Sequence, residues 1–280
     1  MLALIEFTDP YCTWCWGFEP IVRKIQMYYG KQVQISYIMG GLVADMDQFY
    51  DPTNRIGGAN WRQQVADHWK EASHRHGMPV DERIFLELDN DFRSTYPACM
   101  SYKAAQLQDE GTAHKFLRRL REGAAAERKP IHQLIVQQEL AEEVGLDSQR
   151  FLADIKNGNA WKAFLQDLSE CRTRGITGFP TFLIRNDEGQ ESILHGYHKF
   201  DDFVAIFESL ESSALSVHPI KPSQQAIHDF IRKYDNVTEK EIAAVFDLPT
   251  EATREILRQL QEQSSLKKRK VGNGFFYSVA

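Results

Sequence analysis

Two cysteines near the start of the chain, Cys12 and Cys15, have the spacing of a redox dithiol. They follow directly on the apolar run of residues 2–7, which has the composition of a buried strand. Cysteines three positions apart at a strand-to-helix junction can close a small disulfide, and the helix N-terminus favours the anionic thiolate there. The pattern therefore predicts thiol–disulfide chemistry.

The cysteine pair could instead be half of a zinc site or two inert structural cysteines. A structural zinc site needs two further soft ligands at similar spacing. The remaining cysteines, Cys99 and Cys171, are isolated in the sequence, and we expect them to be small buried hydrophobes. The redox pair is therefore the favoured interpretation, and the sequence predicts neither a metal nor a cofactor.

A second motif lies far downstream, in residues 176–182 (Ile-Thr-Gly-Phe-Pro-Thr-Phe). Together with the dithiol and with Glu6, an acidic residue six positions before Cys12, it resembles the thioredoxin superfamily. In that superfamily the corresponding proline is cis and lies against the dithiol. The resemblance implies that Pro180 is this proline. It also implies that Pro180 leaves the backbone of Phe179 free to pair with an extended substrate strand and denies a metal access to both sulfurs.

Length and composition limit the number of domains and indicate the cellular compartment of the protein. The chain has 280 residues, of which 42% are hydrophobic and 26% charged, enough for one large domain or for a large and a small one. No stretch has the apolar length of a membrane helix, and the N-terminus has no basic segment of a signal peptide. We therefore expect a cytoplasmic protein without a membrane partner, whose dithiol is mostly reduced and whose disulfide is transient and catalytic.

The elements that must position the dithiol follow from the pattern of the first forty residues. Leu2–Thr8 predicts a buried strand, and the segment from about Trp16 to Tyr29 predicts a helix with Pro20 near its first turn, where proline is tolerated. Gly30 is the expected stop of this helix. Residues 33–38 alternate in polarity and predict a second strand, parallel to the first through a right-handed crossover.

Between roughly residues 59 and 174 the apolar residues recur at three- and four-residue spacing, which indicates a helical insertion. The expected helices in it are 98–109, 113–125, 133–144 and 148–156. A hairpin follows, with strands at 181–184 and 191–194 about a turn at 186–189, and then a closing helix from Phe200 to about Ser212.

A helical insertion of this size resembles the DsbA-like branch of the thioredoxin superfamily. The motifs that carry the resemblance are residues 9–18 (Asp-Pro-Tyr-Cys-Thr-Trp-Cys-Trp-Gly-Phe), 39–42 (Met-Gly-Gly-Leu) and 97–99 (Pro-Ala-Cys), and it covers residues 1–213. The predicted fold class is therefore α/β, a thioredoxin fold with a large helical insertion. The resemblance implies the activity of a cytosolic dithiol–disulfide oxidoreductase or isomerase, acting on protein or small thiol and disulfide substrates.

The last quarter of the chain predicts a separate small domain. Residues 214–223 are an expected linker, because two prolines prevent a continuous helix there. Residues 224–280 predict three short helices (224–233, 239–246 and 250–261) and a hairpin about Asn273-Gly274, the order of a small winged-helix domain. Thr238 and Glu241 have the spacing of a capping box at the second helix.

The charge of this tail argues against DNA as a partner. From residue 221 onward there are 10 Lys and Arg against 8 Asp and Glu, and the third predicted helix carries glutamates beside its arginines. Nucleic-acid binders are usually far more basic along the recognition helix. Docking of a protein or simple packing is the expected role of the tail.

The whole chain also resembles the adaptor family that presents the redox regulator Spx to the ClpXP protease. Residues 240–248 and 102–108 carry this resemblance, and they add Spx and ClpXP as possible partners. The chain departs from that family in lacking its His- and Cys-rich N-terminal extension and in having an intact CxxC flanked by tryptophan. Both departures favour catalysis, so the sequence predicts an oxidoreductase first and an adaptor as the alternative.

The resemblance assigns roles to the residues around the dithiol. Cys12 is expected to be the attacking thiolate and Cys15 the resolving one. Glu6 is expected to be a buried proton acceptor for Cys15, with its own pKa raised by desolvation. The alternative for Glu6 is a strand residue that faces solvent. Trp14 and Trp16 either frame the substrate groove or pack against the insertion. The predicted substrate-binding residues are Trp14, Trp16, Phe179, Pro180 and Thr181. His74 and His76 are expected to be solvated.

Overall fold

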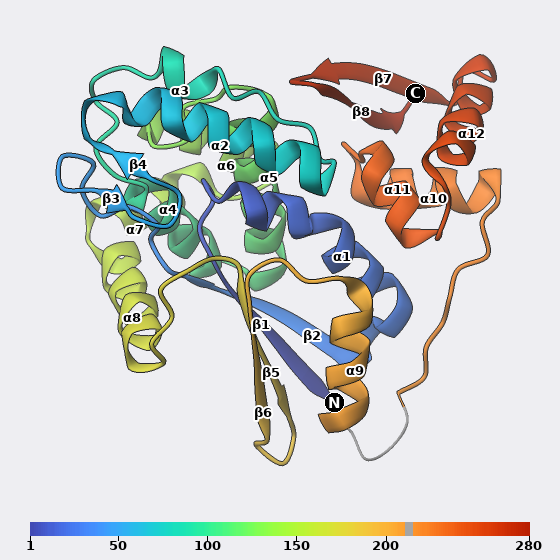
Figure 1. The fold of residues 1–280 in the computed structure, drawn as a ribbon, viewed down its shortest axis with the longest axis horizontal. Helices are drawn as coiled ribbons and strands as arrows, with labels where there is room; N and C mark the ends of the chain where they lie inside the picture. The colour runs from blue at the N-terminus through green and yellow to red at the C-terminus, as the bar shows by residue number, and fades with distance from the viewer. Residues whose placement is uncertain (211–214) are drawn as a thin grey trace.

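A four-stranded mixed sheet forms the centre of the computed structural model, which describes residues 1–210 and 215–280 (Figure 1). The strand order is β2–β1–β5–β6, with bounds β1 Leu2–Thr8, β2 Val33–Met39, β5 Thr181–Asn186 and β6 Glu191–His195. β1 pairs parallel with β2 and antiparallel with β5, and β5 pairs antiparallel with β6. The predicted strands and the predicted parallel crossover are confirmed.

Helix α1 (Thr13–Tyr29) carries the dithiol at its N-terminus. The predicted helix is confirmed, but it begins three residues earlier than expected, because Cys12 itself is the N-cap and its sulfur accepts a hydrogen bond from the backbone N–H of Cys15. Pro20 consequently lies inside the helix and not near its first turn. Gly30 ends the helix at a φ of 54°, a value that glycine adopts without strain.

The insertion between β2 and β5, which lies wholly within the described residues, contains a short hairpin, a 3-10 helix at Gly58–Asn60 and seven α-helices. Their bounds are β3 Tyr50–Asp51, β4 Ile56–Gly57, α2 Trp61–His76, α3 Ile84–Glu87, α4 Tyr96–Gln106, α5 Glu110–Ala126, α6 Leu134–Glu143, α7 Ser148–Lys156 and α8 Asn159–Thr173. The four individually predicted helices are confirmed as α4 to α7, with ends moved by up to three residues. The sequence did not resolve α2 and α8 as separate helices, since both are largely polar.

The two faces of the sheet bury different side chains, because successive residues of a strand point to opposite faces. Leu2 and Leu4 pack with α1 and with α9 (Phe200–Leu210), whose Phe203 and Phe207 are fully buried. Phe7 packs on the other face with Cys171 of α8. Glu6 has the same parity as Leu2 and Leu4, so β1 directs it under α1 and toward the dithiol.

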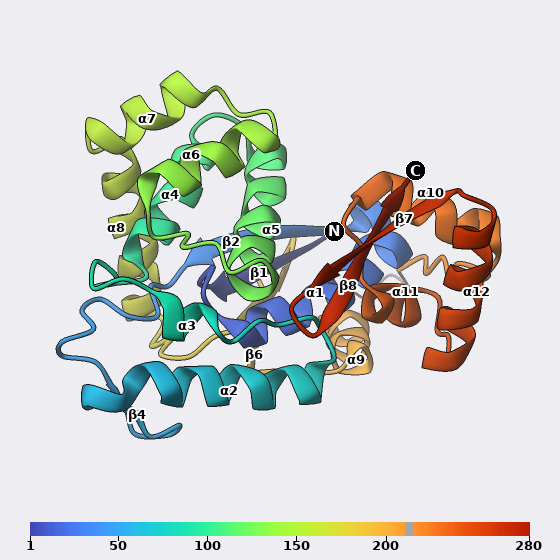
Figure 2. The same ribbon diagram turned by 90° about the horizontal axis from the view of Figure 1, so that it is seen from above.

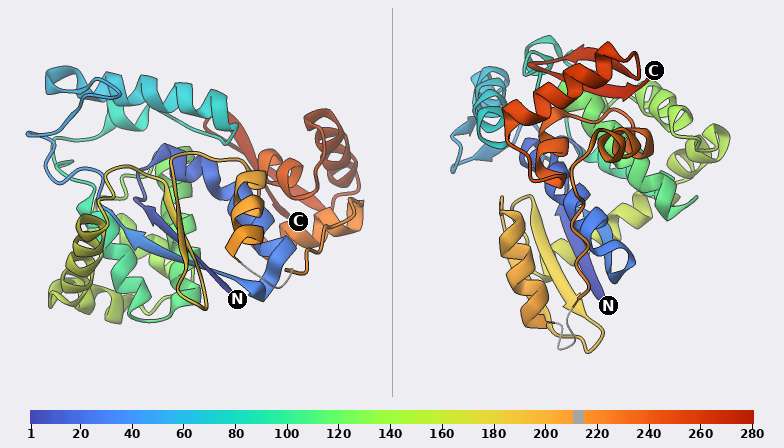
Figure 3. Two further views of the ribbon diagram at one scale, coloured as in Figure 1. Left: turned by 60° about the horizontal axis from the view of Figure 1, so that its bottom comes forward. Right: turned by 90° about the vertical axis from the view of Figure 1, so that its right-hand side faces the viewer.

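The described part of the tail consists of three helices and a hairpin, and it lies at one end of the molecule (Figures 2 and 3). Its elements are α10 Gln224–Tyr234, α11 Glu239–Val245, α12 Thr250–Glu262, β7 Leu266–Val271 and β8 Gly274–Val279. The predicted capping box of Thr238 and Glu241 is confirmed. The order of elements agrees with the sequence, whereas the winged-helix assignment and the boundary at 214–223 stay predictions. The end of the predicted closing helix and the start of the linker fall on residues 211–214, outside the described residues.

The tail is packed against the rest of the chain as well as around its own core. Val271 and Phe276 of its hairpin belong to the large hydrophobic cluster of the insertion. The carboxylate of Asp247 accepts hydrogen bonds from Lys24 and from the Tyr28 hydroxyl, both on α1. Residues 1–210 and the tail therefore share an interface that includes α1. No helix among the described residues is long and apolar enough to cross a membrane.

Candidate dithiol site

Cys12 and Cys15 occupy the first turn of α1 with different access to solvent. Cys12 is 5% exposed, whereas Cys15 is completely buried. The sulfur of Cys12 lies 3.2 Å from the Cys15 backbone nitrogen and 3.5 Å from the Phe179 carbonyl oxygen. A substrate can therefore approach Cys12 more readily than Cys15, which lies behind it.

The loop before β5 brings Phe179 to Cys12. The Phe179–Pro180 peptide bond is cis, as predicted from the resemblance. The Phe179 ring lies over Gly40, where an added Cβ would come within 1.9 Å of the ring. This close approach requires glycine at position 40. Thr181 is buried and donates its hydroxyl to the Gly178 carbonyl oxygen at 2.8 Å, so its side chain holds the loop. Its role in substrate binding stays a prediction.

The two tryptophans that flank Cys15 have separate environments. Trp14 is half-buried and its ring contacts the rings of His68, His76 and Tyr197. Trp16 is 1% exposed, and its indole N–H donates to the Pro79 carbonyl oxygen at 2.8 Å. The prediction that Trp16 frames a substrate groove was wrong. The helical period places it one turn away from the active-site surface, against the insertion and the tail.

His76 is a buried neighbour of the dithiol, which corrects the prediction that it is solvated. Its side chain is 0% exposed, its Nδ1 accepts from the Met78 backbone N–H at 3.0 Å, and its Nε2 lies 3.4 Å from the Thr13 hydroxyl. Burial, with a smaller contribution from Lys240, lowers the pKa of His76 to about 4. The ring is therefore neutral near pH 7. An added Cβ at Gly17 would come within 2.4 Å of this ring, so α1 accommodates His76 through that glycine.

Glu6 lies buried under α1, and the alternative of a solvent-facing strand residue was wrong. One carboxylate oxygen accepts from the Arg121 guanidinium at 2.6 Å, and the other has no hydrogen-bond partner among the described residues. Burial raises the pKa of Glu6 despite the opposing charge of Arg121. Burial also raises the pKa of Cys15 well above its ordinary value, and the neighbouring Cys12 and Glu6 add to the shift. Cys15 is therefore a protonated thiol near pH 7.

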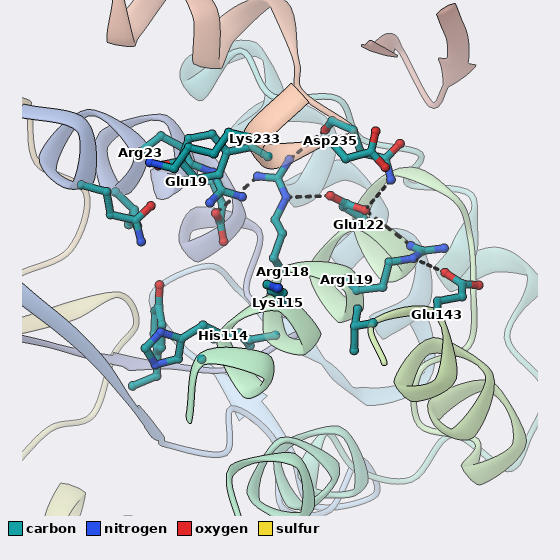
Figure 4. A pocket seen from close by; sticks show the side chains of 18 residues that line it. Glu19, Arg23, His114, Lys115, Arg118, Arg119, Glu122, Glu143, Lys233 and Asp235 are labelled. Carbon is teal, nitrogen blue, oxygen red and sulfur yellow. Dashed lines mark hydrogen bonds and ion pairs between the residues drawn. The ribbon is translucent and has the colours of Figure 1, made fainter. Parts of the chain in front are cut away.

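A row of buried charges extends from Glu6 to the tail. Figure 4 shows two of its members, Glu19 and Arg118. Arg121 donates hydrogen bonds to Glu6 and to Glu19, each at 2.6 Å. Arg118 donates to Glu19 at 3.3 Å and to Glu241 of α11 at 2.8 Å. Burial alone would raise the pKa of Glu19, but Arg118 and Arg121 lower it to about 2. Sequence reasoning missed this row, although Glu19 among the apolar residues of the first half of α1 was a signal.

Asp9 organises the segment before Cys12. It accepts hydrogen bonds from the backbone N–H of Leu42 at 2.7 Å, from the Thr95 hydroxyl at 2.7 Å and from the Cys99 thiol at 3.3 Å. These contacts join the three motifs that carried the resemblance to the DsbA-like branch. Burial of Cys99 and Cys171 is confirmed.

Two cavities lie near α1. One, of about 560 Å³, opens beside Cys12, Trp14 and Phe179. The other, of about 730 Å³, lies between α1, α5 and the start of the tail, and is lined by charged side chains (Figure 4). Among residues 1–210 and 215–280, no cluster of His, Cys, Asp and Glu is suited to hold a metal ion.

This fold, with a CxxC at the start of α1 and a cis-proline loop beside it, defines a thioredoxin-fold protein with a DsbA-like helical insertion. The chain belongs to the thioredoxin family, whose model matches residues 6–205. Two curated relatives are each described as a ClpXP adapter protein SpxH. The one from Halalkalibacterium halodurans is 29% identical and covers 99% of this chain and 89% of its own. The one from Bacillus subtilis is 26% identical, and the match covers 99% of this chain and 88% of the relative.

Solved structures agree on the fold. The cytosolic disulfide reductase DsbM from Pseudomonas aeruginosa is similar with a TM-score of 0.59 at 23% identity, over 74% of this chain and 97% of its own. A candidate protein disulfide isomerase from Nitrosomonas europaea is similar with a TM-score of 0.63 at 20% identity. The match covers 74% of this chain and 96% of the isomerase chain. Identities this low establish the fold and nothing further about the chemistry.

Proposed function

We propose that this protein is a dithiol–disulfide oxidoreductase with Cys12 as its nucleophile. The observation that carries the proposal is the pair of sulfur environments. Cys12 caps α1 and keeps some exposure, while Cys15 is buried behind it as a thiol with a raised pKa. An accessible sulfur at a helix N-terminus and a shielded partner are what attack and resolution respectively require.

Reduction of a substrate proceeds in two exchanges. The Cys12 thiolate attacks one sulfur of the substrate disulfide, so that a Cys12–substrate disulfide forms and the other substrate sulfur leaves as a thiolate. Cys15 then gives its proton to Glu6 and attacks the Cys12 sulfur, which closes the Cys12–Cys15 disulfide and releases the second substrate sulfur. The substrate has gained two electrons, which an external thiol must return to the protein. The reverse sequence oxidises a substrate dithiol.

Insulin reduction in the presence of glutathione tests this proposal. We expect the wild type to accelerate the reaction, and Cys12→Ser to abolish the acceleration. Cys15→Ser should accumulate a mixed disulfide with the substrate, because resolution is blocked. Equal behaviour of the two variants would contradict the assigned roles.

A second function, adapter for the ClpXP protease, is favoured by the relatives. Proteins described as ClpXP adapters align with 99% of this chain, so the likeness includes the tail as well as the thioredoxin-fold part. In this role the cytoplasmic chain presents a Spx-like regulator to ClpXP. A stable interface depends on buried contacts and not on a nucleophile.

Reconstituted degradation of Spx by ClpXP separates the two functions. An adapter accelerates degradation, and a Cys12→Ser/Cys15→Ser variant retains this effect if binding alone is needed. Loss of acceleration in that variant would tie the adapter role to the dithiol. No acceleration by the wild type would remove the adapter role and leave oxidoreductase activity as the function.

A further inference from the structure

The cavity of about 730 Å³ between α1, α5 and the end of α10 shares no lining residue with the cavity beside Cys12. A volume of this size is within the range of pockets that enclose a small-molecule ligand. Among the described residues, its walls carry five basic side chains, which are Arg23, Lys115, Arg118, Arg119 and Lys233, and four acidic ones, which are Glu19, Glu122, Glu143 and Asp235. Figure 4 shows these side chains around the cavity.

Three of the four acids are already engaged by arginine. Glu19 and Glu122 both accept hydrogen bonds from Arg118, at 3.3 and 2.8 Å. Glu143 accepts one from Arg119. Because the protein compensates these carboxylates itself, they oppose the entry of an anion far less than free carboxylates would.

Buried polar atoms that lack a hydrogen-bond partner gather at this cavity. Of the seven such side-chain atoms among the described residues, four belong to residues that line it: Arg23 Nε, Gln26 Oε1, Arg119 Nη1 and the Tyr234 hydroxyl. Arg23 Nε lies 3.6 Å from Glu241, and Arg119 Nη1 lies 3.7 Å from Glu122, distances too long for hydrogen bonds. Three of the four atoms can donate, and buried donors in proteins are almost always paired.

Two exposed lysines, Lys115 on α5 and Lys233 on α10, add positive charge to the cavity. Neither forms an ion pair with a described residue. Lys233 instead contacts the Met27 sulfur at 3.5 Å and lies over the Tyr234 ring. Asp235, the fourth acid, is exposed and also forms no ion pair among the described residues. Two unpaired lysines against one unpaired acid leave this part of the cavity positive.

We propose that this cavity binds a small phosphorylated molecule. A phosphate group carries about two negative charges near pH 7 and three acceptor oxygens, and arginine and lysine are its usual partners in proteins. The free donors of Arg23, Arg119 and Tyr234 come from α1, α5 and α10 respectively, so they suit oxygens that point in different directions. The bound molecule joins the tail to α1 and α5. The site is separate from the dithiol and does not depend on the proposed exchange chemistry.

Isothermal titration calorimetry of the full-length protein tests the site at constant ionic strength, with pyrophosphate as the main probe. We expect saturable binding at one site per chain. Inorganic phosphate should bind more weakly because it fills less of the cavity, and citrate should bind more weakly because its carboxylates are planar. The Cys12→Ser/Cys15→Ser variant should bind pyrophosphate as the wild type does.

Removal of the two unpaired lysines locates the bound anion. The Lys115→Ala/Lys233→Ala variant should bind pyrophosphate about tenfold or more weakly. The matched control is Lys162→Ala/Lys199→Ala, which removes two exposed lysines that do not line the cavity and should leave the affinity unchanged. Asp235→Asn removes the unpaired acid and should strengthen binding.

Tyr234→Phe distinguishes a ligand-binding role from a structural one. Because the Tyr234 hydroxyl has no hydrogen-bond partner in the free protein, its removal should not lower the free energy of unfolding without ligand. The affinity for pyrophosphate should nevertheless fall. A stability loss without ligand together with an unchanged affinity would contradict the proposed role of this hydroxyl.

Three results overturn the site. The first is the absence of saturable pyrophosphate binding, which is the result for a cavity that holds only water. The second is equal affinity of the wild type and Lys115→Ala/Lys233→Ala, because the anion then binds elsewhere. The third is tighter binding of citrate than of pyrophosphate, which contradicts phosphate as the group recognised. None of these results bears on the activity of Cys12, so the oxidoreductase proposal stands or falls separately.

Discussion

The guanidinium group of Arg118 on α5 donates a hydrogen bond to the carboxylate of Glu241, the third residue of α11, at 2.8 Å. Both side chains are almost entirely buried, at 9% and 0% exposure. The pair joins the insertion to the tail. Through Glu19 and Arg121 it is also continuous with Glu6, which lies beneath the dithiol.

Glu241→Gln should destabilise the whole chain and not only the tail. Removing the carboxylate leaves the buried charge of Arg118 with fewer opposite charges around it. Breaking such a buried pair lowers the free energy of unfolding by about 3 kcal/mol. Urea unfolding followed by circular dichroism measures the loss. Glu251→Gln, an exposed change on α12, is the matched control and should cost less than about 0.5 kcal/mol. Equal effects of the two substitutions would show that the buried pair is not important for stability.

Acid should destabilise the protein partly through His76. The pKa of His76 is lowered from 6.5 to about 4 on folding, so between these values the unfolded chain binds a proton that the folded chain excludes. Stability therefore falls as pH decreases from about 6.5 to 4, by about 3 kcal/mol from this residue. Glu19, with its lowered pKa, adds further loss at lower pH.

The His76→Gln variant isolates this contribution, since Gln can accept and donate hydrogen bonds but does not titrate. Its free energy of unfolding should depend less on pH than that of the wild type between pH 4 and 6.5. His74→Gln, at an exposed neighbouring position, is the control. Parallel pH profiles for wild type and His76→Gln would rule out a buried neutral imidazole at this site.

Alkylation should distinguish the four cysteines. Cys12 retains 5% exposure, whereas Cys15 and Cys99 are fully buried. Cys171 is 4% exposed, but burial raises the pKa of its thiol to about 12, so it is protonated near pH 7. In the reduced protein, iodoacetamide should modify one cysteine at least about tenfold faster than the others. Mass spectrometry should assign that fast reaction to Cys12, and Cys12→Ser should remove it. A fast reaction that survives in Cys12→Ser would place the reactive sulfur elsewhere.

Gly40→Ala should slow disulfide exchange by displacing the loop that carries Phe179. The added methyl group would overlap the Phe179 ring at 1.9 Å, so the ring and its carbonyl must move away from Cys12. Insulin reduction should fall about tenfold or more. The double variant Gly40→Ala/Phe179→Ala removes the overlap and should recover part of the activity. If the second substitution gives no recovery, the steric cause is wrong.

The first strand, the dithiol and the cis-proline loop were predictable because each has a local signature in the sequence. These signatures are an apolar run for the strand, a CxxC for the dithiol and a Phe-Pro-Thr motif for the loop. The neighbours that complete the site have no such signature. Arg121 lies 115 residues from Glu6 in sequence, and His76 lies 63 residues from Thr13. Each looked like an ordinary surface residue of a polar helix. Trp16 was misplaced for the same reason, since its partners Pro79 and Phe276 are brought to it only by the insertion and the tail.

The Arg118–Glu241 pair limits how this chain can be recombined with its relatives. A chimaera that joins residues 1–220 of this chain to a foreign tail keeps Arg118 but inherits whatever residue stands at the position of Glu241. Without a carboxylate there, the junction buries an arginine that has lost one of its counter-ions. The exchangeable unit is therefore not the tail segment but the tail together with its matching residues on α1 and α5.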